Sequence, residues 1–359
     1  MKLSSIKEII KDAKNGKMFI LVDDKNRENE GDLIIPGSKC NSKNINFMAK
    51  HGRGLICLAL SKKQVDKLSL PLMSSVNKAR MQTAFTVSIE AKKGITTGIS
   101  AFDRARTIKV AINPNVKRKE IVSPGHVFPL VARNGGVLER AGHTEASVDI
   151  SKLANLNPSS VICEVMNEDG RMARYDDLLK FAKKHKLRIA SIEDLISYRL
   201  KNEKLIYNTN TKIINIKKYG KFELKVFKSI LDGSEHYAIV KGKLKFNKSI
   251  RVRVISTNIL NNIINFQKNT VKSSLNYLCK FNNFVLVLIK DQNLNSLKNS
   301  ISSPKNNSIL RYYGVGAQII KDLKIKNMIL VSRSKKRIIG LEGHGIKIKK
   351  QEIIKWKRF

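Results

Sequence analysis

The chain has 359 residues, of which 42% are apolar, and its 69 Lys and Arg against 29 Asp and Glu give a net charge of +40. This apolar fraction is enough to build hydrophobic cores, so the composition excludes a chain that is disordered throughout. At about 100–200 residues per domain, the length predicts two domains.

Apolar periodicity predicts alternating strands and helices in residues 1–200. In the first helix, Ile6, Ile9 and Ile10 share one face. Helices are expected at residues 4–15, 62–68, 102–112, 144–153, 176–185 and 192–198, and strands at 18–22, 54–60, 83–91, 126–132 and 161–166. This order predicts an α+β domain of α/β layers built on a mixed sheet.

The second half carries a separate pattern. Residues 201–218 are polar and rich in Lys and Asn, and we expect a linker there. A smaller α+β domain is then expected over residues 219–359. Its strands are predicted at 222–227, 236–240, 250–255, 284–289 and 328–331, its helix at 316–323, and a loop at 292–308.

The positive charge is uneven, with a net +14 in residues 1–200 and +26 in residues 201–359. Such a surface attracts any polyanion, so a nucleic-acid-binding protein is one interpretation. Compositional drift is the other, because the chain is rich in Lys, Asn and Ile together. Aromatic residues make up only 6% of the chain and no zinc-finger or RRM-type pattern is present, so we expect no specific nucleic-acid partner.

The cysteines and apolar runs indicate a soluble, cytoplasmic protein. Cys40, Cys57, Cys163 and Cys279 are widely spaced and form no CxxC pair, which argues against disulfides and structural zinc. Charged residues interrupt the N-terminal segment every few positions, unlike the core of a signal peptide. The apolar run at residues 284–289 is too short to cross a bilayer, so we expect no membrane contact.

An acidic segment follows the first predicted strand. Residues 23–32 hold five carboxylates around Arg27, in a chain otherwise poor in acids. Carboxylates this close repel one another unless a cation or a shared proton relieves them. Because hard divalent cations take oxygen ligands, a magnesium site is one interpretation, and a solvated acidic turn is the other.

Two of the six histidines lie in turns shaped by Gly and Pro. His126 lies in PGHVFPL, and His143 lies in RAGHTEA at an expected helix start. Backbone N–H groups at a helix N-terminus bind phosphate, and Arg140 and Thr144 beside them would strengthen such a site. A single histidine is more often structural than catalytic, but two in such turns favour a functional site.

These segments resemble 3,4-dihydroxy-2-butanone 4-phosphate synthase. The resemblance covers essentially all of residues 1–200 and rests on DDKNRENEGDLI, HGRGLICLAL, TAFTVSIEA, GITTGISAFDRARTI, PGHVFPL, GGVLERAGHTEASVDI and SVICEVMNEDGRMA. It implies conversion of the small molecule D-ribulose 5-phosphate into L-3,4-dihydroxy-2-butanone 4-phosphate and formate in riboflavin biosynthesis. It also implies a homodimer that uses Mg²⁺ or Mn²⁺.

The same resemblance implies roles for individual residues. Glu28 and His143 would be the metal ligands, and His126, Glu164 and Asp32 the catalytic residues. The substrate would be held by Arg27, Glu28, Asp32, Arg140, Ala141, Gly142, His143, Thr144 and Glu164. Removing a proton beside the ketone gives an enediolate that a divalent cation stabilises, and the later steps need repeated proton transfers, which we expect from Asp32 and Glu164.

Residues 222–242 and 310–348 are similar to GTP cyclohydrolase II, which is often fused behind the synthase. That family binds catalytic zinc through three cysteines, because thiolates suit zinc and an open fourth position activates water. The positions that match these cysteines are Asn258, Asn269 and Val271.

The remaining catalytic positions of that family are also altered. Its proton-accepting aspartate matches Ile309 and its GTP loop is replaced at residues 290–295, although Arg311 stands where the family has a nucleophilic arginine. We therefore expect a cyclohydrolase-like domain without zinc and without activity. The alternative is a bifunctional enzyme that also hydrolyses GTP.

Overall fold

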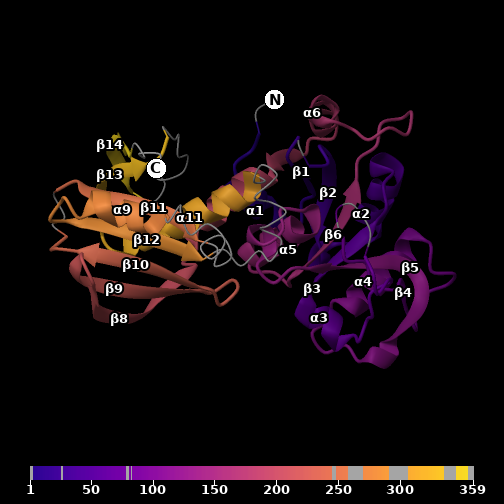
Figure 1. Ribbon diagram of the computed structural model, residues 1–359. Helices are drawn as coiled ribbons and strands as arrows, with labels where there is room; N and C mark the ends of the chain where they lie inside the picture. The colour runs from indigo at the N-terminus through magenta and orange to yellow at the C-terminus, as the bar shows by residue number, and fades with distance from the viewer. Residues whose placement is uncertain are drawn as a thin grey trace. The chain divides into compact units, whose positions relative to one another are not determined.

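The computed structural model describes residues 3–25, 27–77, 81, 83–244, 248–257, 270–290, 306–334 and 345–354. The chain forms two compact units, Met1–Tyr198 and Arg199–Phe359 (Figure 1). Each unit has its own sheet and its own apolar cores.

The first unit is built on a seven-stranded sheet of order β4-β5-β3-β6-β2-β1-β7. Its strands are β1 (Phe19–Val22), β2 (Gly31–Pro36), β3 (Cys57–Ser61), β4 (Ile89–Ala91), β5 (Ile121–Ala132), β6 (Ser159–Glu164) and β7 (Arg188–Ser191). The pairs β1·β7 and β3·β5 are parallel and the other pairs antiparallel. The expected mixed sheet and α+β fold are confirmed.

Helices cover both faces of this sheet. They are α1 (Ile6–Lys14), α2 (Ser42–Phe47), α3 (Lys62–Lys67), α4 (Ala101–Ala111), α5 (His143–Leu153), α6 (Tyr175–Lys184) and α7 (Ile192–Asn202). Side chains of α2, α3, α4 and α6 join one large apolar cluster with Leu33 and Cys163 of the strands. On the opposite face, Val148 of α5 packs on Ala59 and Ala132. Successive side chains of a strand point to opposite faces of the sheet, so neighbouring strand residues face the large core and α5 in turn.

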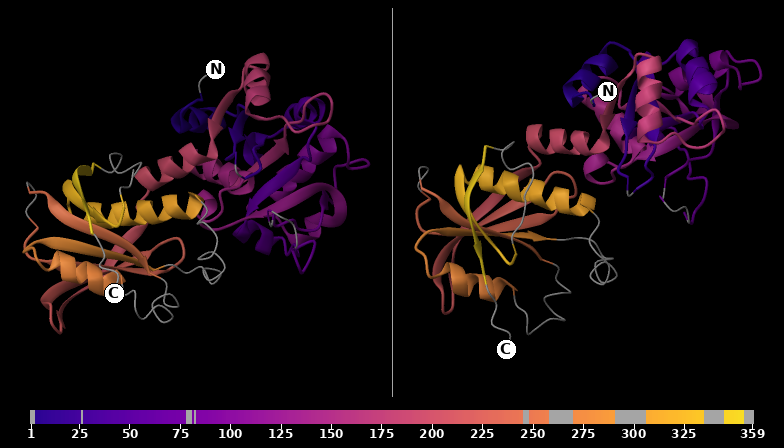
Figure 2. Two further views of the ribbon diagram at one scale, coloured as in Figure 1. Left: turned by 45° about the horizontal axis from the view of Figure 1, so that its top comes forward. Right: turned by 90° about the horizontal axis from the view of Figure 1, so that it is seen from above.

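The second unit holds a seven-stranded sheet of order β14-β13-β11-β12-β10-β9-β8. Its strands are β8 (Ile206–Ile216), β9 (Gly220–Ser229), β10 (Glu235–Lys241), β11 (Ile250–Thr257), β12 (Phe284–Lys290), β13 (Asn327–Ser332) and β14 (Lys347–Ile353). The helices α9 (Thr270–Leu278) and α11 (Asn306–Asp322) lie on opposite faces (Figure 2). Ile319 of α11 belongs to one apolar cluster and Leu278 of α9 to the other.

The expected linker at residues 201–218 is wrong in large part. Residues 206–216 form β8, which pairs along the length of β9, and α7 extends to Asn202. Most side chains of β8 are exposed, so this edge strand lacks the apolar alternation that would have indicated it. In the expected loop at 292–308, residues 306–308 begin α11 and residues 292–305 lie outside the described residues.

No helix in the described ranges is both long enough and apolar enough to span a membrane.

Candidate active site

The acidic segment between β1 and β2 folds around the side chain of Asp23, which is 1% exposed. Its carboxylate accepts the backbone N–H groups of Glu28 (3.1 Å) and Glu30 (2.9 Å). It also accepts a bond from Arg27 Nη1 at 2.8 Å, and Arg27 pairs with Glu28 as well. The loop is therefore an ordered turn that presents Glu28, rather than a solvated acidic turn.

Glu28 faces the first residue of α5. His143 Nδ1 lies 3.8 Å from Glu28 Oε2 and 3.7 Å from Asp32 Oδ1, and the His143 side chain is 7% exposed. Asp23, Glu28 and His143 offer ligand atoms within 4.8 Å of one another. Sequence reasoning noted Asp23 among the acids but gave it no role. The Asp23 oxygens already accept three N–H bonds, so Glu28 and His143 have more capacity left to bind a metal ion.

These residues fit a hard divalent cation. Asp32 Oδ1 is buried, and within the described part of the chain nothing donates a hydrogen bond to it. Carboxylates with one imidazole are a donor set that suits Mg²⁺ or Mn²⁺. The expected ligands Glu28 and His143 are thus brought together with Asp32.

Asp32 and Glu164 are cross-strand neighbours. Antiparallel pairing of β2 with β6 sets them opposite each other, on the face away from Leu33 and Cys163 and toward α5. Glu164 Oε2 accepts the backbone N–H of Leu55 at 2.9 Å. Gly54 lies against the same carboxylate, where a Cβ would stand 2.6 Å from Oε2, so only glycine leaves room for this side chain.

Burial sets the proton affinities of these groups. Burial raises the pKa of Asp32 well above its usual value, and the charge of Glu164 raises it further. Burial also raises the pKa of Glu164 and lowers the pKa of His143. Carboxyl groups with raised pKa values can give and take protons near neutral pH, as general acid–base chemistry requires.

The start of α5 gathers the residues expected at a phosphate. Gly142 is the N-cap, with no side-chain hydrogen bond to the first turn, and Thr144 is buried. Arg140 Nη1 donates to Glu145 Oε2 at 2.6 Å and Nη2 donates to the carbonyl of Met81 at 3.1 Å. Arg140, Gly142, His143 and Thr144 therefore meet at one helix N-terminus, with Ala141 between them.

His126 is not brought into this group. Its Nδ1 lies 2.7 Å from Glu90 Oε1, and its side chain is 43% exposed. His126 lies in β5, two residues before Phe128, which pairs with Cys57 of β3, whereas Asp32 lies in β2. In the sheet order, three strand spacings of about 4.8 Å separate β5 from β2, about 14 Å in all.

Sequence reasoning missed Glu90 and Gly54 as partners of the predicted catalytic residues. Glu90 lies in the motif TAFTVSIEA and Gly54 in HGRGLICLAL. Their position in these family motifs is the sequence feature that could have pointed to them. Cys57 is buried in β3.

The second unit shows no comparable group among its described residues. Val271 lies in α9 and Cys279 directly follows it, and both pack partly buried against the apolar cluster of α9. Ile309 and Arg311 lie in α11. The expected positions Asn258 and Asn269, and residues 291–295, lie outside the described residues.

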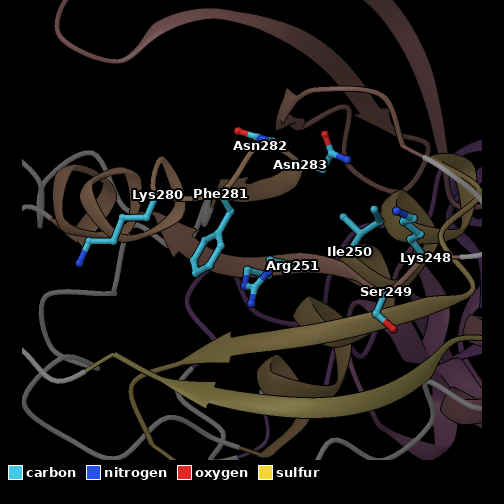
Figure 3. A pocket seen from close by; sticks show the side chains of 8 residues that line it. All are labelled: Lys248, Ser249, Ile250, Arg251, Lys280, Phe281, Asn282 and Asn283. Carbon is cyan, nitrogen blue, oxygen red and sulfur yellow. The ribbon is translucent and has the colours of Figure 1, made fainter.

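A pocket of about 330 Å³ opens where β11 and β12 begin (Figure 3). Its lining residues are Lys248, Ser249, Ile250, Arg251, Lys280, Phe281, Asn282 and Asn283. Arg251 lies 3.6 Å from the centre of the Phe281 ring and makes two bonds to Glu352, at 2.9 and 3.0 Å. No thiol, imidazole or carboxylate is among these lining residues, so the pocket does not supply a zinc site.

Comparison with known proteins finds a separate family match for each half of the chain. The family model for 3,4-dihydroxy-2-butanone 4-phosphate synthase matches residues 7–198, and the model for GTP cyclohydrolase II matches residues 208–353. The chain belongs to the 3,4-dihydroxy-2-butanone 4-phosphate synthase family.

Similar proteins match either nearly the whole chain or about half of it. The riboflavin biosynthesis protein RibBA of Aquifex aeolicus (strain VF5) is 42% identical, over 99% of this chain and 93% of its own length. The crystal structure of RibBX, a two-domain 3,4-dihydroxy-2-butanone 4-phosphate synthase from A. baumannii, superposes with a TM-score of 0.84 at 40% identity, covering 99% of this chain and 100% of that one. A synthase crystallised with two magnesium ions gives a TM-score of 0.53 at 38% identity, covering 56% of this chain and 98% of that one.

The buried carboxyl group of Asp32 yields a prediction on stability. Because its pKa is raised in the fold, the folded state binds the proton more tightly than the unfolded chain does. Its contribution is full below about pH 4, the unfolded pKa, and is lost as the pH rises through the folded pKa. We expect Asp32→Asn to raise the melting temperature of the metal-free protein at pH 7 by about 2–6 °C, with a gain that shrinks toward pH 5.

Calorimetry from pH 5 to pH 8 in the presence of a chelator measures this difference. Asp66→Asn is the control, since the Asp66 side chain is 58% exposed. A lower melting temperature for Asp32→Asn at pH 7 would contradict the prediction.

Proposed function

We propose that the first unit converts D-ribulose 5-phosphate into L-3,4-dihydroxy-2-butanone 4-phosphate and formate, as a lyase of riboflavin biosynthesis. The observation that carries the proposal is the meeting of Glu28, Asp32, His143 and Glu164 at one end of α5. Family membership supports the same reaction.

Each residue of the group has a part in this proposal. Glu28 and His143 hold Mg²⁺ or Mn²⁺, and the synthase with two bound magnesium ions supports divalent-metal use. The ion supplies positive charge that opposes negative charge on the vicinal oxygens of the substrate. Asp32 and Glu164 exchange protons with the substrate carbons and oxygens, because their raised pKa values suit both directions of transfer.

The phosphate end is bound by the N-terminus of α5. The N-cap residue Gly142 makes no side-chain cap bond, and Arg140 and Thr144 add a guanidinium and a hydroxyl. Arg27, which pairs with Asp23 and Glu28, orients the sugar. His126 supplies the remaining catalytic group.

Loss of a metal ligand tests the proposal directly. We expect Glu28→Gln and His143→Ala each to lower formate release from D-ribulose 5-phosphate by at least about 100-fold, because the charge that stabilises the transition state is lost. The control is Glu168→Gln, since Glu168 is 85% exposed. Formate release with excess Mg²⁺ is the measurement, and near-normal rates in either variant would remove the metal assignment.

We propose further that the protein acts as a homodimer in which His126 of one copy serves the site of the other. The separation of about 14 Å between strands β5 and β2, which carry His126 and Asp32, supports this arrangement. The first unit also exposes large apolar side chains of the kind that interfaces cover, namely Leu72, Met73, Val76, Ile99 and Phe102.

Complementation distinguishes a shared site from a site within one chain. Glu28→Gln and His126→Ala should each be nearly inactive alone. When the two variants are co-expressed, about half of the dimers are mixed and each has one intact site, so about a quarter of wild-type formate release should return. A mixture as inactive as its components would contradict the shared site.

The second unit, in our proposal, is a cyclohydrolase-like domain without zinc and without GTP hydrolysis, and it stabilises the synthase unit. The replacement of the cysteine positions by Asn258, Asn269 and Val271 supports this. The bifunctional alternative draws on the match to the GTP cyclohydrolase II model.

Metal and activity analysis separates these two alternatives. We expect the purified full chain to contain no stoichiometric zinc and to release no formate from GTP, because no thiolate set is available to hold the ion. The matched control is formate release from D-ribulose 5-phosphate by the same preparation. Stoichiometric zinc together with GTP hydrolysis would establish the bifunctional enzyme.

We also propose a cytoplasmic location, without a membrane or a specific nucleic-acid partner. The four free cysteines suit a reducing compartment. The excess charge accounts for weak, salt-sensitive binding to polyanions.

A further inference from the structure

The peptide of Glu28 is held on both sides. Its N–H donates to Asp23 Oδ2, as described above, at 3.1 Å. Its carbonyl oxygen accepts Arg174 Nη1 at 2.7 Å, and the next carbonyl, of Asn29, accepts the same nitrogen at 2.8 Å. Hydrogen bonds from a charged donor are stronger than those between neutral groups. Arg174 therefore holds the carbonyl groups of the loop, while Asp23 holds its N–H groups.

Arg174 is itself fixed to a rigid element. It is the N-cap residue of α6, and its backbone N–H donates to Asp177 Oδ2 at 3.1 Å. Leu178 and Ala182 of α6 are buried in the large core. Leu178 also packs on Gly31, the first residue of β2, where a Cβ would stand 2.6 Å from Leu178 Cδ1. The loop that carries Glu28 is thus braced by α6 at the carbonyls of Glu28 and Asn29 and again at Gly31.

We infer that Arg174 is a positioning residue for the metal ligand Glu28. It acts through the backbone of residues 28 and 29 and sets where the Glu28 carboxylate stands relative to His143. This rests on the proposed function insofar as it takes Glu28 as a ligand. A ligand held in place before the ion arrives binds it more tightly, because less ordering is left to the binding step.

The charge of Arg174 acts in the opposite direction. Its Nη1 lies 3.5 Å from Glu30 Oε1, and a cation this near to the loop opposes the binding of another cation. The Arg174 side chain is 47% exposed, so solvent screens this repulsion. Removing the guanidinium therefore weakens metal binding if positioning dominates and strengthens it if charge dominates.

Three variants of the full chain separate the two effects. Arg174→Gln removes the charge and the paired bonds, while Arg174→Lys keeps the charge and one donor group. Arg171→Gln is the matched control, because it removes the same charge three residues away from a side chain that is 86% exposed and pairs only with Asp169 among the described residues. Binding of Mn²⁺ to the substrate-free protein is followed by electron paramagnetic resonance of the free ion, and melting temperatures report the fold.

We expect Arg174→Gln to bind Mn²⁺ about tenfold more weakly than wild type, Arg174→Lys to recover part of the loss, and Arg171→Gln to match wild type. In formate release, Arg174→Gln should need more Mg²⁺ for half-maximal rate, with kcat largely restored at saturating Mg²⁺ and KM for D-ribulose 5-phosphate changed less. A merely structural role would lower the melting temperature without this dependence on metal.

Unchanged or tighter Mn²⁺ binding by Arg174→Gln would overturn the inference. If Arg174→Gln does not fold, the lysine variant decides, since wild-type Mn²⁺ affinity at a lowered melting temperature would assign Arg174 to stability alone. Glu28→Gln in the same titration distinguishes failure of the metal assignment from failure of the role inferred for Arg174. If Glu28→Gln weakens Mn²⁺ binding and Arg174→Gln does not, only the inference fails; if Glu28→Gln also leaves it unchanged, the metal assignment fails first.

Discussion

Mutual repulsion among buried carboxylates is the constraint on which the first unit depends. Asp23, Glu28, Asp32 and Glu164 lie close enough that their charges act on one another, and Asp32 is almost fully buried. Isolated, such a cluster would move apart or bind protons. It holds because β2 and β6 fix Asp32 against Glu164 through backbone pairing, which does not depend on side-chain charge. The sheet thus keeps these carboxylates close together although their mutual repulsion disfavours the folded state. The same closeness is what the proposed metal and proton chemistry needs.

The supports around the cluster are mainly backbone contacts. Asp23 accepts the N–H groups of Glu28 and Glu30, and Leu55 donates its N–H to Glu164. Gly54 leaves space that any side chain would fill. Backbone donors are fixed by the fold and carry little conformational entropy, so they hold a carboxylate with less reorganisation than a long side chain would.

Local patterns in the sequence predicted most elements of the first unit, because strands and helix caps depend on neighbouring residues. The family resemblance pointed to Glu28 and His143, while Asp23 of the same group received no role. Pairing between distant segments could not be read in this way. The juxtaposition of Asp32 and Glu164 comes from the register of β2 and β6, and the distance of His126 comes from strand order. β8 was mistaken for a linker because an edge strand exposed on both faces needs no apolar alternation.

The carboxylates of the second unit that the structure describes include several with hydrogen-bond or ion-pair partners in its framework. Glu352 accepts two bonds from Arg251 and one from Tyr277, Glu203 pairs with Arg199, and Asp232 accepts Ser234 in the turn before β10. These acids hold the framework together. Among the described residues of this unit, no carboxylate belongs to a group of three metal-ligating side chains, as Asp23 and Glu28 of the first unit do. The described carboxylates named here thus serve as ion-pair and turn partners, in a half of the chain whose net charge is +26.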